Sequence, residues 1–213
     1  MIRNAAAVAL AAGVLASGSL VLTGCATGSV SHGASESGLG LAEGVRAPNA
    51  TVRDTEGGSV RLASLYGDGP VVVTFYRGSW CPYCNNALTE WQGKLDDLEA
   101  AGGRLVALTP DKPENAAGTV GKHDLGFTVL SDADFEAADA FGVRFSLDAD
   151  TREKYKGYGI DLAKSNASGD WDLPHPGTFV IDSSGVIRYA WVSSDYATRA
   201  NPDEVIAAVR DAS

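Results

Sequence analysis

The order of apolar and polar positions divides the chain from about residue 45 onward into alternating strands and helices. Unbroken apolar runs predict buried strands over residues 71–77, 104–109 and 127–130. After the first run, apolar positions recur at spacings of three and four residues over 88–98, which predicts one amphipathic helix. The glycine pair at 102–103 is expected to end that helix.

Capping and turn residues predict the remaining elements. Residues 111–114 are typical of a helix start, and Asp132 is suited to cap a second helix that runs toward Phe141. The turn sequence at 182–185 separates two apolar runs and predicts a β-hairpin. Residues 201–204 combine a capping asparagine, a proline at the first helical position and acidic residues, and they predict a final helix.

Residues 144–174 carry a weaker pattern, with a helical turn expected over 151–158 and a loop over 166–170. Taken together, the elements alternate between strand and helix three times before the hairpin and the last helix. This order predicts an α/β fold with a central mixed β-sheet flanked by helices on both faces.

The first 24 residues predict a signal peptide. Arg3 precedes an uncharged stretch of mainly Ala, Val and Leu that is short for a membrane span. The stretch ends in Leu-Thr-Gly-Cys25, which resembles a bacterial lipobox and implies cleavage before Cys25 and lipidation of that cysteine. An ordinary secretory signal with an unrelated cysteine is the alternative. We therefore expect an extracytoplasmic protein that is lipid-anchored to the cell membrane.

The residues after Cys25 differ in composition from the rest of the chain. Residues 26–44 are rich in Gly, Ser and Ala, which is typical of a flexible tether. The predicted organisation is a signal peptide over 1–24, a lipidated cysteine and tether over 25–44, and one domain over 45–213. The formal net charge is −10, and the chain does not have the excess of basic residues that is typical of a nucleic-acid-binding protein.

Three cysteines are too few for a disulfide scaffold, and two of them form a close pair. Cys81 and Cys84 lie where the first strand leads into a helix, with Pro82 suited to the first helical turn. Side chains three apart in a helix lie about 5–6 Å apart at Cβ, close to disulfide distance. The helix N-terminus and the positive charge of Arg77 favour a reactive thiolate, and Trp80 can shield it.

A zinc site and a structural disulfide are two alternative roles for Cys81 and Cys84, and the sequence supports both less well than a redox role. A zinc site needs more ligands, and only His123 and His175 remain in the domain besides the two cysteines. A structural disulfide between Cys81 and Cys84 would close too small a loop to stabilise the fold much. We therefore expect redox chemistry without a metal or another cofactor.

The segment Trp80-Cys81-Pro82-Tyr83-Cys84 resembles a thioredoxin active site. The longer stretch 75–84, with Ala47-Pro48 upstream and residues 176–182 downstream, resembles the peroxiredoxin-like branch of the AhpC/TSA family. The resemblance implies a thioredoxin-like fold. It also implies thiol-dependent reduction of a hydroperoxide or exchange with a disulfide substrate, followed by reduction by an external thiol such as a thioredoxin-like protein.

The sequence departs from the peroxiredoxin pattern at several positions. Arg77 replaces the usual proline, Cys81 replaces the threonine, and Cys84 occupies the position of the peroxidatic cysteine. The family's later arginine falls at Pro176. By resemblance to thioredoxin, Pro176 would be a cis-proline facing the dithiol, with an ordinary trans-proline as the alternative.

These departures leave the attacking cysteine open. Thioredoxin-like chemistry makes Cys81 the nucleophile, whereas peroxiredoxin-like chemistry oxidises Cys84 first, and both end in a Cys81–Cys84 disulfide. The leading hypothesis is a peroxiredoxin-like thiol peroxidase. An envelope disulfide reductase and a non-enzymatic metal- or substrate-binding lipoprotein are the alternatives.

Overall fold

The computed structural model describes Glu36 and residues 38–213. The predicted signal peptide, the lipidation of Cys25 and the first part of the tether lie outside the described residues. Among the helices within the described residues, none is long and apolar enough to cross a membrane.

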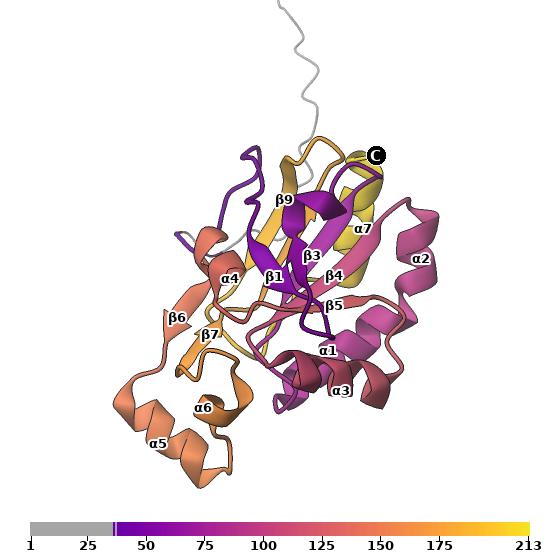
Figure 1. Ribbon diagram of the computed structural model, residues 1–213. Coiled ribbons are helices and arrows are strands. Elements are labelled where there is room, and N and C mark those ends of the chain that lie inside the picture. The colour runs from indigo at the N-terminus through magenta and orange to yellow at the C-terminus, as the bar shows by residue number, and fades with distance from the viewer. Residues whose placement is uncertain (1–35, 37) are drawn as a thin grey trace, which may run out of the picture. The chain divides into compact units, whose positions relative to one another are not determined.

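Within the described residues, seven strands form the main sheet (Figure 1), and their spatial order is β2-β1-β5-β4-β3-β8-β9. The bounds are β1 (Thr51–Arg53), β2 (Ser59–Arg61), β3 (Val71–Phe75), β4 (Arg104–Thr109), β5 (Thr128–Ser131), β8 (Gly177–Ile181) and β9 (Ile187–Val192). Strands β3, β4 and β5 pair in parallel, and the other pairings are antiparallel. The predicted mixed sheet and the late hairpin, β8–β9, are confirmed.

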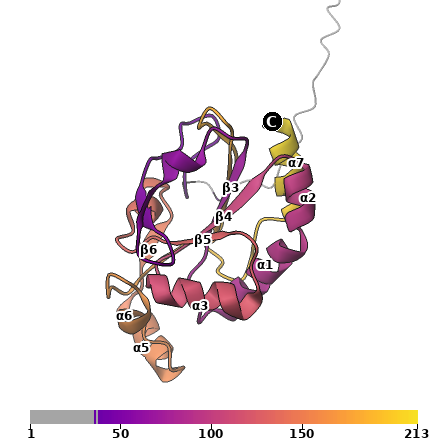
Figure 2. The ribbon, with the colours of Figure 1, turned by 45° about the vertical axis from the view of Figure 1, so that its right-hand side comes forward.

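The helices are α1 (Pro82–Gly93), α2 (Leu95–Ala100), α3 (Pro113–His123), α4 (Glu136–Ala140), α5 (Ala149–Gly157), α6 (Leu162–Ser165), α7 (Pro202–Asp211) and a 3₁₀ turn, η1 (Leu62–Leu65). A separate two-stranded sheet joins β6 (Arg144–Ser146) to β7 (Asp172–Pro174). In both ribbon views α2 lies beside α7, while α5 and α6 lie together on the opposite side (Figures 1 and 2).

Alternate residues of β3 belong to two hydrophobic clusters, one on each face of the sheet. Val73 and Phe75 pack with α4 and the N-terminal segment, and the Phe75 ring meets Phe141 edge to face at 5.4 Å between centroids. Val72 packs on the other face with apolar residues of α1, α2, α3 and α7. The strand is therefore buried on both sides, as its unbroken apolar run predicted, and helices cover both faces.

The predicted helix over 88–98 is divided in two. Helix α1 ends after Gly93, and Lys94 leaves the helical conformation with φ −109° and ψ 4°. Glycine lowers helix stability by about 1 kcal/mol relative to alanine, which favours a break at this position. Leu88 and Leu98 still enter one hydrophobic cluster, so the apolar spacing predicted the buried face correctly and the continuity of the helix wrongly.

Asp132 caps α4 from a distance. The helix begins at Glu136, after Phe135 adopts a left-handed φ of 57°. The Asp132 carboxylate accepts hydrogen bonds from the backbone N–H groups of Ala137 at 2.9 Å and Ala138 at 2.7 Å. The predicted capping role is confirmed, although the helix is shorter than expected.

The end of the predicted tether packs on the domain. The Gly40 and Leu41 N–H groups donate to the carbonyls of Gly142 at 3.2 Å and Phe141 at 3.1 Å. Leu39 and Leu41 pack against the core cluster on the α4 side. The prediction of a flexible tether up to residue 44 is therefore wrong for this part. The stretch is rich in Gly and Ser on average, but its two leucines pack against the core.

Residues 144–174 contain more regular structure than their pattern predicted. Helix α5 extends the predicted turn, and Asp148 caps it by accepting from the Thr151 N–H at 2.8 Å. Strands β6 and β7 enclose α5 and α6, and Leu147, Leu162 and Leu173 form a small buried cluster beneath them. Three buried leucines far apart in sequence give no periodic signal, which explains why the pairing of β6 with β7 was missed. We call residues 144–174 the insert.

Candidate active site

The two cysteines meet at the start of α1. Cys81 is the N-cap residue with φ −90° and ψ 112°, and Pro82 occupies the first turn. Cys84 lies one turn further on, and both cysteines are free thiols with 1% exposure. The structure thus brings together the predicted pair, but Cys81 stands just before the helix rather than inside its first turn.

Cys84 receives two hydrogen bonds from arginines. The backbone N–H of Arg77 donates to its sulfur at 3.4 Å, and Nη2 of Arg199 donates to the same atom at 3.2 Å. Arg77 precedes α1 in the loop after β3, whereas Arg199 comes from the loop between β9 and α7. The sequence analysis identified Arg77 but not Arg199. Arg199 lies 115 positions from Cys84, and the local sequence at 193–200 gives no sign that the two residues are in contact.

The surroundings separate the two thiols chemically. Hydrogen bonds from the Cys84 side chain and backbone to the Cys81 sulfur lower the pKa of Cys81 to about 6, and the positive charges of Arg77 and Arg199 act in the same direction. Burial raises the pKa of Cys84 well above its ordinary value. The pair therefore holds its first negative charge on Cys81, with Cys84 as the hydrogen-bond donor.

A buried carboxylate supports the loop before the cysteines. Asp111 is fully buried and accepts a hydrogen bond from the Ser79 N–H at 2.7 Å. Gly78 adopts a φ of 145°, and a Cβ there would lie 2.5 Å from Nε1 of Trp80 and 2.9 Å from Oδ1 of Asp111. Burial raises the pKa of Asp111 to about 6. Only glycine fits the turn that carries the chain from β3 to Cys81.

Three aromatic rings surround the Arg77 guanidinium. Its Cζ lies 5.2 Å from the centre of the Trp80 ring, 5.6 Å from that of Tyr155 and 4.9 Å from that of Tyr196. Nη2 donates a hydrogen bond to the Tyr155 hydroxyl. Arg77 is 3% exposed, and no carboxylate among the described residues forms a salt bridge with it. This positive charge is therefore held by cation–π contacts beside the thiols.

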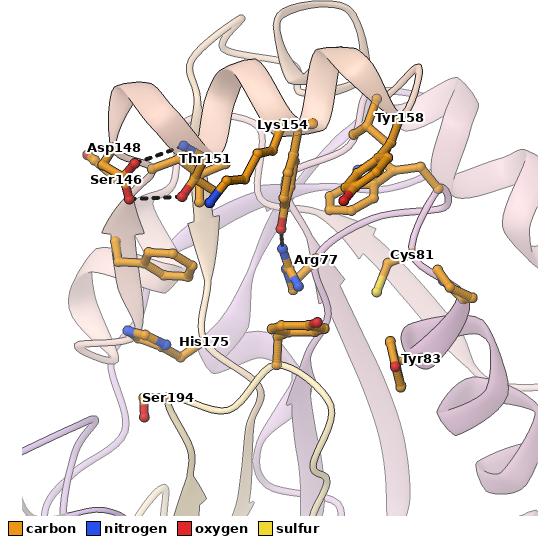
Figure 3. A pocket seen from close by; sticks show the side chains of 17 residues that line it. Arg77, Cys81, Tyr83, Ser146, Asp148, Thr151, Lys154, Tyr158, His175 and Ser194 are labelled. Atoms are coloured by element: carbon orange, nitrogen blue, oxygen red, sulfur yellow. Dashed lines mark hydrogen bonds between the residues drawn. The ribbon is translucent and has the colours of Figure 1, made fainter.

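A cavity of ≈ 660 Å³ opens onto Cys81. Figure 3 shows Arg77 and Cys81 on one side of it, with Lys154 and Tyr158 facing them from the insert. His175 and Tyr83 complete its margin, whereas Cys84 is absent from its lining. A molecule in the cavity therefore reaches Cys81 before Cys84.

Trp80, for which the sequence predicted a shielding role, lies beside Cys81 in the wall of the cavity. Its ring meets that of Tyr155 edge to face at 5.6 Å. Tyr83 is 47% exposed and contacts the ring of Tyr196 at 5.6 Å. Several residues of the insert line the cavity, and one of them, Tyr155, contacts Arg77 directly; the sequence pattern did not single it out.

Pro176 has the trans geometry that was left open as the alternative, and not the cis geometry implied by the resemblance to thioredoxin, since the described residues contain no cis peptide bond. Pro176 leads directly into β8, and its carbonyl accepts a hydrogen bond from the Ser193 N–H at 3.1 Å. The extended trans chain continues the pairing of the hairpin. Its neighbour His175 lines the cavity instead and stacks on Phe145 with 4.2 Å between ring centroids.

No group of three or more His, Cys, Asp or Glu side chains able to hold a metal ion occurs within residues 38–213 or at Glu36. His123 lies at the end of α3, and it does not line the cavity beside Cys81.

The AhpC/TSA family model matches residues 44–190. The chain belongs to the AhpC/TSA family. A putative peroxiredoxin of Mycobacterium tuberculosis is 36% identical over 102 residues, which cover 48% of this chain and 64% of that protein. This chain therefore matches less than two thirds of that relative's length. Peroxiredoxin Bcp of Escherichia coli is 30% identical over 166 residues, covering 78% of this chain and 94% of Bcp.

Solved structures support the fold. Peroxidoxin BcpB from Mycobacterium tuberculosis superposes with a TM-score of 0.64 at 22% identity, covering 81% of this chain and 97% of that one. Peroxiredoxin Q from Xanthomonas campestris superposes with a TM-score of 0.61 at 18% identity, covering 79% and 97%. The predicted thioredoxin-like fold and the resemblance to the AhpC/TSA family are confirmed.

Proposed function

We propose that the protein is a thiol peroxidase that reduces hydroperoxides through a Cys81–Cys84 dithiol–disulfide cycle. The observation that carries the proposal is the low-pKa Cys81 thiol at the start of α1, facing a cavity, with a second thiol hydrogen-bonded behind it. Membership of the AhpC/TSA family and the names of the peroxiredoxin relatives support the same activity.

The first step is attack by Cys81. Its thiolate attacks the terminal oxygen of the hydroperoxide, the O–O bond breaks, and the leaving alkoxide takes a proton from solvent to form an alcohol. Cys81 is oxidised to a sulfenic acid. Cys81 rather than Cys84 acts first because Cys81 lines the cavity and carries the lower pKa.

The second step forms the disulfide. Cys84 loses its proton, its sulfur attacks the Cys81 sulfur, and the hydroxyl of the sulfenic acid leaves as water. An external thiol then attacks the Cys81 sulfur, and Cys84 leaves as a thiolate. The proposed reductant is a dithiol protein of the thioredoxin type.

The cavity favours a hydroperoxide larger than hydrogen peroxide. Its volume of ≈ 660 Å³ lies within the range of small-molecule sites, and most of its walls are aromatic or aliphatic. Tyr155, Tyr158 and Ile160 of the insert supply part of this apolar lining. An organic hydroperoxide would bury apolar surface there, whereas hydrogen peroxide would not.

We also propose that lipid on Cys25 holds the protein at the outer face of the cell membrane. The support is the order of Arg3, an uncharged apolar stretch and Leu-Thr-Gly-Cys25 in the sequence. Mass spectrometry of the mature N-terminus tests this proposal. An N-terminal Cys25 carrying acyl chains is the expected product, and an unmodified Cys25 would refute it.

Peroxide consumption and trapping of the intermediate test the enzymatic proposal. The reduced protein is supplied with hydrogen peroxide or cumene hydroperoxide, and the loss of thiols is followed. Cys84→Ser is expected to accumulate a sulfenic acid on Cys81, whereas Cys81→Ser is expected to lose peroxidase activity by about a thousandfold or more.

Three results would contradict parts of this scheme. Sulfenic acid that forms on Cys84 in the Cys81→Ser variant at the wild-type rate would reverse the order of attack. Equal efficiency with both peroxides would remove the role given to the cavity. Rapid reduction of a disulfide-bonded protein with negligible use of either peroxide would identify a disulfide reductase instead.

A further inference from the structure

Arg199 is fixed between its own loop and the Cys84 sulfur. Nη1 donates to the backbone carbonyls of Tyr196 at 2.8 Å and Thr198 at 2.5 Å, and Nη2 donates to Cys84 Sγ at 3.2 Å. The planar guanidinium therefore has one end held by the backbone and the other end directed at a reacting atom. An arginine held in this way loses little further conformational freedom when the sulfur becomes charged.

The groups around Cys84 come from three parts of the chain. Cys81 lies one turn before it, while Tyr76 and the Arg77 N–H approach from the end of β3, and Arg199 approaches from the loop before α7. Burial and the Cys81 sulfur both disfavour a negative charge on Cys84. The positive charges of Arg199 and Arg77 oppose them, and Arg199 is the arginine whose side chain donates a hydrogen bond directly to the Cys84 sulfur.

We propose that Arg199 is a catalytic residue that stabilises negative charge on the Cys84 sulfur. This role rests on the proposed dithiol cycle. Charge develops on Cys84 when its thiol loses a proton, before the resulting thiolate attacks the sulfenic acid of Cys81; the S–S bond then forms, the S–O bond breaks, and the leaving hydroxide takes up a proton to become water. Charge develops there again when an external thiolate opens the disulfide and the Cys84 thiolate leaves, so a single arginine assists both halves of the cycle.

The competing explanation is that Arg199 only ties its loop to α1. The two explanations predict opposite changes in the reactivity of Cys84. Loss of a structural tie would expose the buried sulfur and speed its modification. Loss of a stabilising charge would lower the thiolate fraction at a given pH and slow the modification.

The test uses the full chain with Cys25→Ser and Cys81→Ala, which leaves Cys84 as the single cysteine. The rate of alkylation by iodoacetamide is measured as a function of pH with Arg199 intact, with Arg199→Gln and with Arg199→Lys. Below the midpoint of the titration the rate follows the thiolate fraction. Arg199→Gln is expected to slow alkylation about tenfold, since a charge at this distance moves a pKa by about one unit or more.

Arg199→Lys is expected to recover part of the rate, because it keeps the charge but loses the planar fork. Arg210→Gln, which removes an exposed charge on α7, serves as the matched control and is expected to change nothing. An unchanged or faster rate in Arg199→Gln, including a rise caused by unfolding, would overturn the proposal. Because alkylation consumes no peroxide, this result is independent of whether the protein proves to be a peroxidase.

Discussion

The β3–α1 segment and the insert face each other across the cavity, yet they differ in how their structure is specified. Residues 75–84 hold the reacting sulfurs, and their chemistry follows from a strand end, a glycine turn and a helix start that are contiguous in sequence. The insert is held by three scattered leucines and touches the thiol site through Tyr155. The comparison indicates that one region sets reactivity while the other sets which molecules approach.

The largest effect expected in the β3–α1 segment is on the titration of its first thiol. Alkylation of Cys81 in the reduced protein is expected to have its midpoint near pH 6, where an ordinary thiol titrates near 9. The rate should rise with pH through this midpoint because the thiolate is the reactive form. Site-resolved mass spectrometry of iodoacetamide-treated protein measures it, and a midpoint near 9, or earlier modification of Cys84, would contradict the assignment of the charge.

The buried Asp111 is expected to make stability depend on pH. Burial raises the folded-state pKa from 3.8 to about 6, so its carboxylate is destabilising above pH 6, and this penalty disappears as the pH falls toward 4. Relative to wild type, Asp111→Asn should therefore gain about 2.5 kcal/mol of unfolding free energy between pH 4 and pH 7.

Urea unfolding at the two pH values measures this difference. Asp132 also has a raised pKa, but it is present in both proteins, so its contribution cancels. A difference between Asp111→Asn and wild type that is constant across the pH range would show that the Asp111 carboxylate is not destabilised by burial.

Gly78→Ala tests whether the turn before Cys81 requires glycine, as its geometry indicates. The added Cβ would meet Trp80 and Asp111 at under 3 Å in a left-handed conformation, and we expect a loss of about 2 kcal/mol of stability together with reduced peroxidase activity. Gly121→Ala is the matched control, because it lies inside α3 with nothing within 4 Å of its Cβ. Thermal unfolding compares them, and equal effects of the two substitutions would show that the turn is not restrictive.

The smallest effect is expected in the insert. Tyr155→Phe keeps the ring against Trp80 but removes the hydrogen bond to Arg77, which is worth about 1 kcal/mol. We expect KM for cumene hydroperoxide to rise about fivefold while the alkylation midpoint of Cys81 stays near pH 6.

Tyr66→Phe, which loses a hydrogen bond to the Pro48 carbonyl away from the cavity, is the control and should leave KM unchanged. If Tyr155→Phe moved the Cys81 midpoint by a full pH unit instead, the insert would also set reactivity, and the division between the two regions would fail.

Most of the sheet and the thiol pair could be predicted from the sequence, because their signals are local. The unbroken apolar run of β3 and the spacing of Cys81 and Cys84 at a helix start each lie within a dozen residues. Arg199 and Tyr155 could not be predicted, since each reaches the site from more than 70 residues away and neither belongs to a local motif. The sequence left open whether Pro176 is cis or trans, because a short motif does not determine how the chain enters β8, and the structure has it trans.

The attachment of Glu36 and of residues 38–44 to the domain limits the distance between the domain and the proposed lipid on Cys25. The Glu36 N–H donates to the Val192 carbonyl at 3.0 Å, so the chain is already held to the sheet at this point. Only about 11 residues then separate the domain from Cys25, and a fully extended chain of that length spans roughly 40 Å. With lipid on Cys25, a chain of this length would keep the point of attachment at Glu36 within roughly 40 Å of the bilayer surface.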